Sequence, residues 1–247
     1  MSNVTICYRN ILENSTVTSS DENTSFPLYR TYDRDIGKLF KFNTHGPNLN
    51  LKITQGAVSY PVSRLIIPAG HTLNGQTLFL QHSTTGVWAG EQVTAVTWTQ
   101  SDALVINKSF GSVTMKYWSF AITTDPAAPP EIPELYLTSD YVFERNVKLN
   151  VTEKNQRNIY REESLSGRVR LVKNGLERRA RNYTVLVKND TQKVDFEAWN
   201  SVYDGIKPYY ILDHDTDLIY MEMLNNMEFE YVHRDYSIVT LELLEVL

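Results

Sequence analysis

The stretch Thr123–Arg145, TTDPAAPPEIPELYLTSDYVFER, decides how the chain is divided. It holds four of the nine prolines. Each proline fixes φ and removes a backbone donor, so this run is suited neither to a helix nor to a central strand. A proline-rich run of this kind is typical of a stiff, extended spacer. A strand-like pattern begins directly after it, at Glu134–Leu137. We therefore predict a linker over 125–133 between two domains, residues 1–124 and residues 134–247.

The bulk composition is that of a folded protein. A chain of 247 residues is long enough for two domains. Its hydrophobic fraction of 42% and aromatic fraction of 11% argue against disorder. No run approaches the roughly 18 apolar residues of a membrane helix, so no membrane insertion is expected. The start, MSNVTICYRN, lacks a basic segment followed by an apolar one, so we expect no secretory signal. With Cys7 as the single cysteine, no disulfide framework and no thiolate metal site are expected.

The N-terminal part consists of short strand-like runs separated by turn residues. Leu49–Ile53 alternates between apolar and polar positions, as a half-buried strand does. Comparable runs follow at Val62–Ile67, Thr77–Gln81, Val93–Trp98, Ala103–Ile106 and Val113–Ile122. Short strands at this spacing, with Gly and Asn between them, predict a β-sandwich or jelly roll over residues 1–124.

Several segments of this part resemble a discoidin-like (galactose-binding-like) domain. The segments that resemble its start are Ser15–Ser20, Phe26–Pro27, Tyr32–Asp35 and Lys38–Phe40. The later PVSRLIIPAGHTLNGQTLFLQHS, Pro61–Ser83, is similar to that family's strand pair and intervening loop. The chain departs from the family at Arg34, where glycine is frequent, and at Phe40, where tryptophan is common. The resemblance covers nearly all of residues 1–122 and implies a galactose-binding-like sandwich.

One aromatic residue of this part is a candidate for binding. Trp88 lies in the polar, Gly-flanked stretch Thr84–Gly90. A large aromatic side chain on a loop is suited to stacking on a sugar or on a partner surface. The alternative is that Trp88 caps one end of the sandwich. Trp98 and Trp118 stand inside strand-like runs, so we expect both in the core.

The C-terminal part combines strands with one helix. The pair Asn174-Gly175 predicts a tight hairpin turn that joins strands over 166–172 and 178–187. The stretch TQKVDFEAWNSVY, Thr191–Tyr203, has the spacing of an amphipathic helix, which Gly205 ends.

Charge is segregated within this C-terminal part. Arg145–Tyr183 contains eleven Lys or Arg and four Glu, whereas Thr184–Leu247 contains four Lys or Arg and thirteen Asp or Glu. Such an asymmetry indicates nucleic-acid binding or contact between oppositely charged surfaces of neighbouring copies. Tyr160 is the only aromatic residue between Asn146 and Asn182, so we favour contact between copies around a ring. The ring-interface candidates are Arg168, Arg170, Arg178, Arg179 and Arg181.

The same part resembles the C-terminal portion of a tailed-bacteriophage minor tail or distal tail protein. The similar stretches, in order, are Pro133–Asn146, Ser164–Val185, Asp195–Asp213 and Asp235–Val246. The resemblance implies a tail-tube-like split β-barrel that assembles as a ring, a hexamer or a trimer. It also implies the partners: further copies, the tail tube, and tail-tip or baseplate hub proteins, with DNA only as cargo in the lumen. Such a protein belongs to the virion and is assembled in the cytoplasm of the bacterial host.

No pattern typical of catalysis or metal binding is present in the sequence. It has no G-x-S-x-G, P-loop or G-x-G-x-x-G motif. Asp213–Asp217 imitates the start of a calcium-binding loop, but Leu218 stands at its sixth position and Leu224 at its twelfth. The five histidines lack metal-ligand spacing. We therefore expect no enzymatic activity, no metal and no cofactor.

The sequence thus predicts a mainly β protein, with an N-terminal β-sandwich followed by a split β-barrel that carries one helix. The leading hypothesis is a structural component of a phage tail tip. Its ring would continue the tail tube, and its outer domain would dock onto partner proteins or bind a host-surface glycan. The alternative is a carbohydrate-binding adhesin module that does not assemble into a ring.

Overall fold

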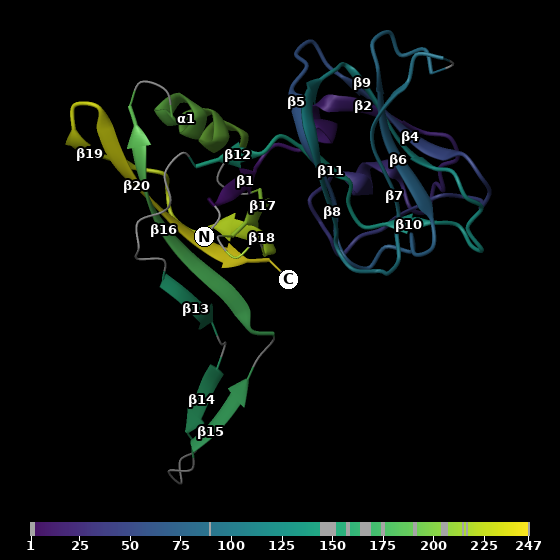
Figure 1. Cartoon of the computed structure of the whole chain (residues 1–247). Helices are drawn as coiled ribbons and strands as arrows, with labels where there is room; N and C mark the ends of the chain where they lie inside the picture. Colours follow the sequence, from purple (N-terminus) through teal and green to yellow (C-terminus); the bar gives the residue numbers. More distant parts are fainter. Residues whose placement is uncertain are drawn as a thin grey trace. The chain divides into compact units, whose positions relative to one another are not determined.

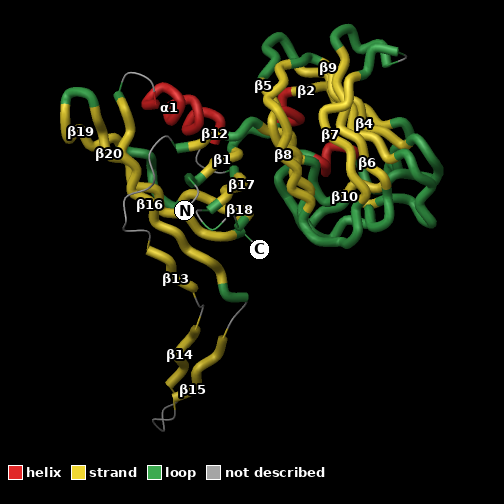
Figure 2. Tube along the Cα trace, viewed as in Figure 1, coloured by secondary structure: helices red, strands yellow, loops and turns green. Residues whose placement is uncertain are grey.

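The computed structural model describes residues 3–88, 90–143, 152–156, 159–163, 169–173, 176–189, 192–203, 207–213, 215 and 217–246. Only the backbone is described for residues 152–156, 159–163, 169–173 and 203. Strands dominate these residues, which contain a single α-helix (Figure 1, Figure 2). The prediction of a mainly β protein is confirmed. No helix in the described ranges is both long and apolar enough to cross a membrane.

The chain forms two compact units that do not simply follow one another in sequence. One unit, here called the insert, comprises Arg9–Asp140, and the other, the scaffold, comprises Met1–Tyr8 and Tyr141–Leu247. Strand β1 (Thr5–Cys7) pairs antiparallel with β12 (Tyr141–Val142). The whole insert therefore occupies the connection between two neighbouring strands of the scaffold, a placement that the predicted boundaries did not anticipate.

The proline-rich stretch predicted as a linker at 125–133 lies within the insert. Its last part forms β10 (Glu131–Ile132), which pairs with β3 (Phe40–Lys41). The amide of Phe42 also donates to the carbonyl of Pro130 at 3.1 Å. Proline has no backbone N–H to donate, and it is tolerated at the edge of a sheet because no neighbouring strand needs that donor there. The prolines therefore shape one edge of the insert instead of separating two domains.

The insert is a sandwich of antiparallel strands, which confirms the β-sandwich predicted for the N-terminal part. Its larger sheet has the order β2–β4–β9–β6–β7, and its smaller sheet has the order β11–β5–β8. The strands of the larger sheet are β2 (Ser15–Ser19), β4 (Leu49–Gln55), β9 (Tyr117–Ile122), β6 (Thr77–Ser83) and β7 (Val93–Thr99). Those of the smaller sheet are β11 (Tyr136–Thr138), β5 (Pro61–Ile67) and β8 (Ile106–Thr114). Two short 3-10 turns, η1 (Ile11–Asn14) and η2 (Leu28–Thr31), complete the unit.

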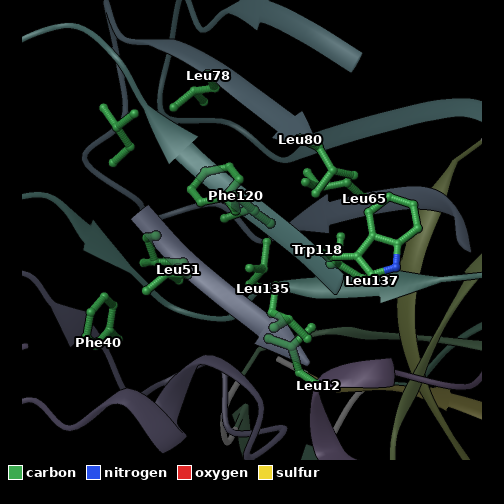
Figure 3. Packing of buried hydrophobic residues seen from close by; sticks show 14 of the residues in the cluster. Leu12, Phe40, Leu51, Leu65, Leu78, Leu80, Trp118, Phe120, Leu135 and Leu137 are labelled. Atoms are coloured by element: carbon green, nitrogen blue, oxygen red, sulfur yellow. The ribbon is translucent and has the colours of Figure 1, made fainter. Parts of the chain in front are cut away.

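The core of the insert lies between its two sheets. Phe120 of β9 stands opposite Leu51 of β4 on one side and Leu80 of β6 on the other, and all three are fully buried. Figure 3 shows these side chains in one cluster with residues of the smaller sheet. Trp118 is also fully buried, as predicted, whereas Trp98 on the edge strand β7 remains partly exposed. Alternation along each strand therefore directs one apolar face inward.

The scaffold is built on one antiparallel sheet with the order β12–β1–β17–β18–β20–β16–β13, and β19 pairs with β20. Its further strands are β13 (Thr152–Gln156), β16 (Arg178–Lys188), β17 (Tyr209–Leu212), β18 (Leu218–Met223), β19 (Phe229–His233) and β20 (Tyr236–Glu245). The predicted helix is confirmed as α1 (Gln192–Tyr203). Phe196 and Trp199 on α1 are buried and belong to the same core as Tyr209 and Leu241 of the sheet.

Two features of the scaffold differ in detail from the sequence prediction. In the described residues the sheet stays open, because its end strands β12 and β13 pair only with β1 and β16. The hairpin predicted around Asn174-Gly175 is also different. Strand β15 (Val169–Lys173) pairs with β14 (Ile159–Glu163), while β16 pairs with β13 and β20. The turn pair itself lies outside the described residues.

Candidate functional site

The loop between β6 and β7 carries Trp88, the residue predicted to contact a glycan or a partner. Ser83, at the end of β6, holds the start of this loop. Its hydroxyl donates to the carbonyl of Val87 at 3.3 Å and accepts from the amide of Gly86 at 3.0 Å. Trp88 follows directly and is partly exposed. The backbone on the N-terminal side of Trp88 is therefore fixed by a side chain of the strand that precedes it.

The aromatic ring of Tyr117 lies close to the same loop at Gly86. Gly86 has φ +85°, and a Cβ at this position would stand 3.0 Å from atoms of the Tyr117 ring. The positive φ and the close approach both require glycine here. The Thr85 hydroxyl also contacts the Glu91 carboxylate across the loop. Trp88 is therefore held by a supported turn, and it does not belong to the buried core of the sandwich.

A buried carboxyl group lies beside β11, and the sequence analysis did not identify it. Glu134 is fully buried, and neither of its side-chain oxygens has a hydrogen-bond partner among the described residues. Burial raises the pKa of Glu134 to about 8. The positive charge of Arg34 opposes this shift, and the negative charges of Glu13 and Asp33 add to it. The Glu134 carboxyl therefore keeps its proton at neutral pH.

The surroundings of Glu134 are organised by polar side chains. Arg34 is almost buried, has φ +61° and contacts the Glu13 carboxylate. The side-chain amide of Asn10 donates to the carbonyl of Leu135 at 3.0 Å, and its oxygen accepts from the amide of Leu137 at 3.3 Å. Asn10 therefore joins the first residues of the insert to its last strand. An acidic residue in the otherwise apolar run beside Leu135 was the signal that could have indicated this site.

The arginines predicted at a ring interface are largely engaged within the scaffold. Arg179 contacts the carboxylates of Glu245 and Asp217, each at 3.1 Å. Arg178 lies 3.9 Å from the Glu222 carboxylate and is partly exposed. Arg179 thus ties the start of β16 to the end of β20 and to the turn before β18.

Arg181 is buried and is part of an internal network. Its Nε donates to the Asp213 carboxylate at 3.1 Å, and the Tyr183 hydroxyl donates to the other oxygen of that carboxylate at 2.9 Å. Arg181 and Asp213 are both at most 8% exposed at the side chain. Among the other interface candidates, Arg168 lies outside the described residues, and only the backbone of Arg170 is described.

The acidic turn that imitates a calcium loop has a structural role at its first residue. Asp213 accepts from Arg181 and Tyr183, as described, and its amide donates to the carbonyl of Asp217 at 2.9 Å. Across the ranges that the structure describes, no group of three or more His, Cys, Asp or Glu side chains is arranged to hold a metal ion.

Comparison with known proteins gives matches among solved structures. No family model matches the chain, and no curated protein matches it. Chitosan-binding module 1 of a chitosanase/glucanase from Paenibacillus sp. IK-5 aligns with 53% of this chain and 99% of its own, at 19% identity and a TM-score of 0.47. The family 32 carbohydrate-binding module of NanJ from Clostridium perfringens, in complex with galactose, aligns with 55% of this chain and 99% of its own, at 14% identity and a TM-score of 0.45. A second Clostridium perfringens module, CpGH89CBM32-5 in complex with GalNAc-β-1,3-galactose, aligns with 53% of this chain and all of its own, at 12% identity and a TM-score of 0.45.

Proposed function

We propose that the insert binds carbohydrate and that Trp88 makes the main contact. The observation that carries this proposal is a partly exposed indole beside a turn that Ser83 and Tyr117 hold in place. An indole offers a flat apolar face to the C–H groups of a sugar ring and an N–H to its hydroxyls. Because the turn is already ordered, little conformational entropy is lost when a ligand binds.

Binding of the full-length protein to a glycan array tests this proposal. The affinity is then measured for each glycan that binds. The Trp88→Ala variant should lose binding by about five- to tenfold, since stacking of this size is worth about 1–1.5 kcal/mol. The matched control is Val87→Ala, which truncates an exposed apolar residue in the same loop. Equal binding by wild type and the Trp88→Ala variant would contradict the role of Trp88. A wild-type protein that binds no glycan would contradict the carbohydrate function itself.

A second function, self-assembly through the scaffold, is favoured by the separation of charge along it. The segment Arg145–Tyr183 is basic and Thr184–Leu247 is acidic, and head-to-tail association between oppositely charged surfaces would use such a difference. In this proposal the chain is a distal-tail or minor-tail component of a phage tail tip. Its scaffold forms a ring that continues the tail tube and meets the hub proteins, and its insert docks onto partners or binds a host glycan.

Light scattering on the full chain at low and high salt tests the assembly. We expect particles of several times the single-chain mass of 28.4 kDa, and these should become smaller as salt screens the contacts. A single-chain mass at every concentration and salt level, together with failure to co-sediment with purified tail proteins, would contradict it. The carbohydrate-binding module without ring assembly would then be the function that stands.

A further inference from the structure

An exposed aromatic ring lies beside an arginine at η2 of the insert. Phe26 precedes η2 and is 37% exposed. The guanidinium carbon of Arg30 lies 5.6 Å from the centre of the Phe26 ring, and the ammonium of Lys41 lies 5.8 Å from it. A cation at such a distance is attracted by the electrons of an aromatic ring. The Phe26 ring therefore holds two positively charged side chains next to an apolar surface that stays open to solvent.

Most of the hydrogen-bonding capacity of Arg30 is unused. Its Nη1 donates to the carbonyl of Leu39 at 3.2 Å, which is the one hydrogen bond of this side chain among the described residues. Its Nε is buried and has no partner there. Glu22 accepts from the amide of Leu28 at 2.8 Å and forms no ion pair with Arg30. Because part of the guanidinium has left water without gaining an acceptor, an anion that reaches it replaces interactions that were lost.

The neighbouring lysines already have partners. Lys41 forms an ion pair with Glu131 at 2.8 Å. Lys38, in the loop between η2 and β3, forms one with Asp35 at 2.7 Å. Arg30 is therefore the cation of this cluster that forms no ion pair within the described part of the chain.

This arrangement suits a sugar that carries a carboxylate. A carboxylate accepts two N–H groups of one guanidinium at once. The C–H groups of a sugar ring pack on an aromatic side chain, and more than a third of Phe26 is open to them. A nucleic acid would bring a row of phosphates, which several unpaired cations would have to receive. The single unpaired charge of Arg30 matches one carboxylate.

We propose that Phe26 and Arg30 form a second binding site of the insert, which takes a uronic acid unit of a glycan. Arg30 binds the carboxylate, and Phe26 packs against the sugar ring. This site goes beyond the one proposed at Trp88. Trp88 lies on the loop between β6 and β7, whereas η2 contacts β2 and β3, and β2 and β7 form opposite edges of the larger sheet.

NMR titration of the full-length protein with a disaccharide that contains glucuronic acid tests this assignment. The matched ligand is the methyl ester of the same disaccharide, which keeps the sugar rings and removes the charge. We expect the acid to bind about tenfold more tightly than the ester, because only the acid makes charge-assisted hydrogen bonds to Arg30. The Nε–H signal of Arg30, which is shielded from water, should shift with the acid and stay in place with the ester.

Variants assign the contacts to their residues. Arg30→Lys keeps the charge without the planar fork and should bind the acid about tenfold more weakly. Arg30→Gln should bind acid and ester alike, and Phe26→Ala should weaken both by about fivefold. Lys52→Gln, which removes an exposed positive charge from β4, is the matched control and should bind like wild type. Should thermal melting show that Arg30→Gln does not fold, Arg30→Lys decides the role of Arg30.

The outcomes separate this inference from the function proposed for Trp88. If wild type binds acid and ester equally, or binds neither, the second site does not take a carboxylate. If Trp88→Ala loses the acid and Arg30→Gln keeps it, the acid binds at Trp88, so the proposed function stands and this inference fails. If Trp88→Ala keeps the acid and Arg30→Gln loses it, the second site is confirmed. A single-stranded oligonucleotide that binds more tightly than the disaccharide and depends on Arg30 would overturn the assignment to a sugar.

Discussion

Replacing Glu134 by glutamine should remove most of the pH dependence of the insert's stability in the neutral range. Burial raises the pKa of Glu134 to about 8 from an ordinary value of 4.5. Between these two values the folded state keeps a proton that the unfolded chain releases. The free energy of unfolding therefore falls as pH rises. The contribution of Glu134 to the free energy of unfolding is fully present below pH about 4.5 and is fully lost above pH about 8.

The size of this effect follows from the pKa shift. Each pH unit inside the window lowers the free energy of unfolding by about 1.4 kcal/mol, so raising the pH from about 5 to about 8 removes about 4 kcal/mol from the wild type. Glutamine has nearly the shape of a protonated glutamate and no charge to gain. The Glu134→Gln variant should therefore match wild type near pH 5 and exceed its stability by about 4 kcal/mol near pH 8.

Denaturant unfolding followed by tryptophan fluorescence over a series of pH values measures this difference. Three of the four tryptophans (Trp88, Trp98 and Trp118) lie in the insert, so the signal reports mainly on that unit. Glu131→Gln, three residues earlier and half-exposed, is the matched control and should keep the wild-type slope. If the Glu134→Gln variant loses stability with rising pH as steeply as wild type, the argument from burial is wrong.

Three further predictions concern other internal contacts. Asp213→Ala takes a carboxylate from the buried Arg181 and should destabilise the scaffold by about 3 kcal/mol or more in denaturant unfolding, whereas an unchanged midpoint would show that the network adds little. Burial lowers the pKa of His71, so the folded state keeps this imidazole neutral while the unfolded chain takes up a proton. The free energy of unfolding should therefore fall as pH drops below about 6.5. The His71→Gln variant should show a smaller fall, and an equal fall would contradict this role of His71. Asn10→Ala removes three buried hydrogen bonds and should cost about 1–3 kcal/mol, seen as faster hydrogen exchange at Leu137, and unaltered exchange there would contradict its role.

Local patterns in the sequence were sufficient for the regular elements. The helix at Gln192–Tyr203 was predicted because its apolar residues recur at helical spacing. The sandwich followed from alternating runs such as Leu49–Gln55, whose inward positions are buried as expected. These features depend on neighbouring residues only, so a single sequence contains the information needed to find them.

The features that the sequence analysis missed depend on contacts between distant parts of the chain. The three residues of β1 pair with β12 and β17, more than 130 residues away, and no local sequence pattern indicates these pairings. The prolines up to Pro133 indicated a spacer, but hydrogen bonds to distant strands hold that stretch in the insert. Glu134 was missed for a related reason, because its burial results from the packing of η1, the turn at Arg34 and β11 around it.

The insertion between β1 and β12 has a mechanical consequence. A module on a single tether swivels freely, whereas the insert is attached through two chains that leave neighbouring strands about 5 Å apart. A force applied to the insert therefore loads β1 and β12 together, and β1 passes the load to β17 across its hydrogen bonds. Tension on the insert is thus carried into the central sheet of the scaffold by the hydrogen bonds of a three-residue strand.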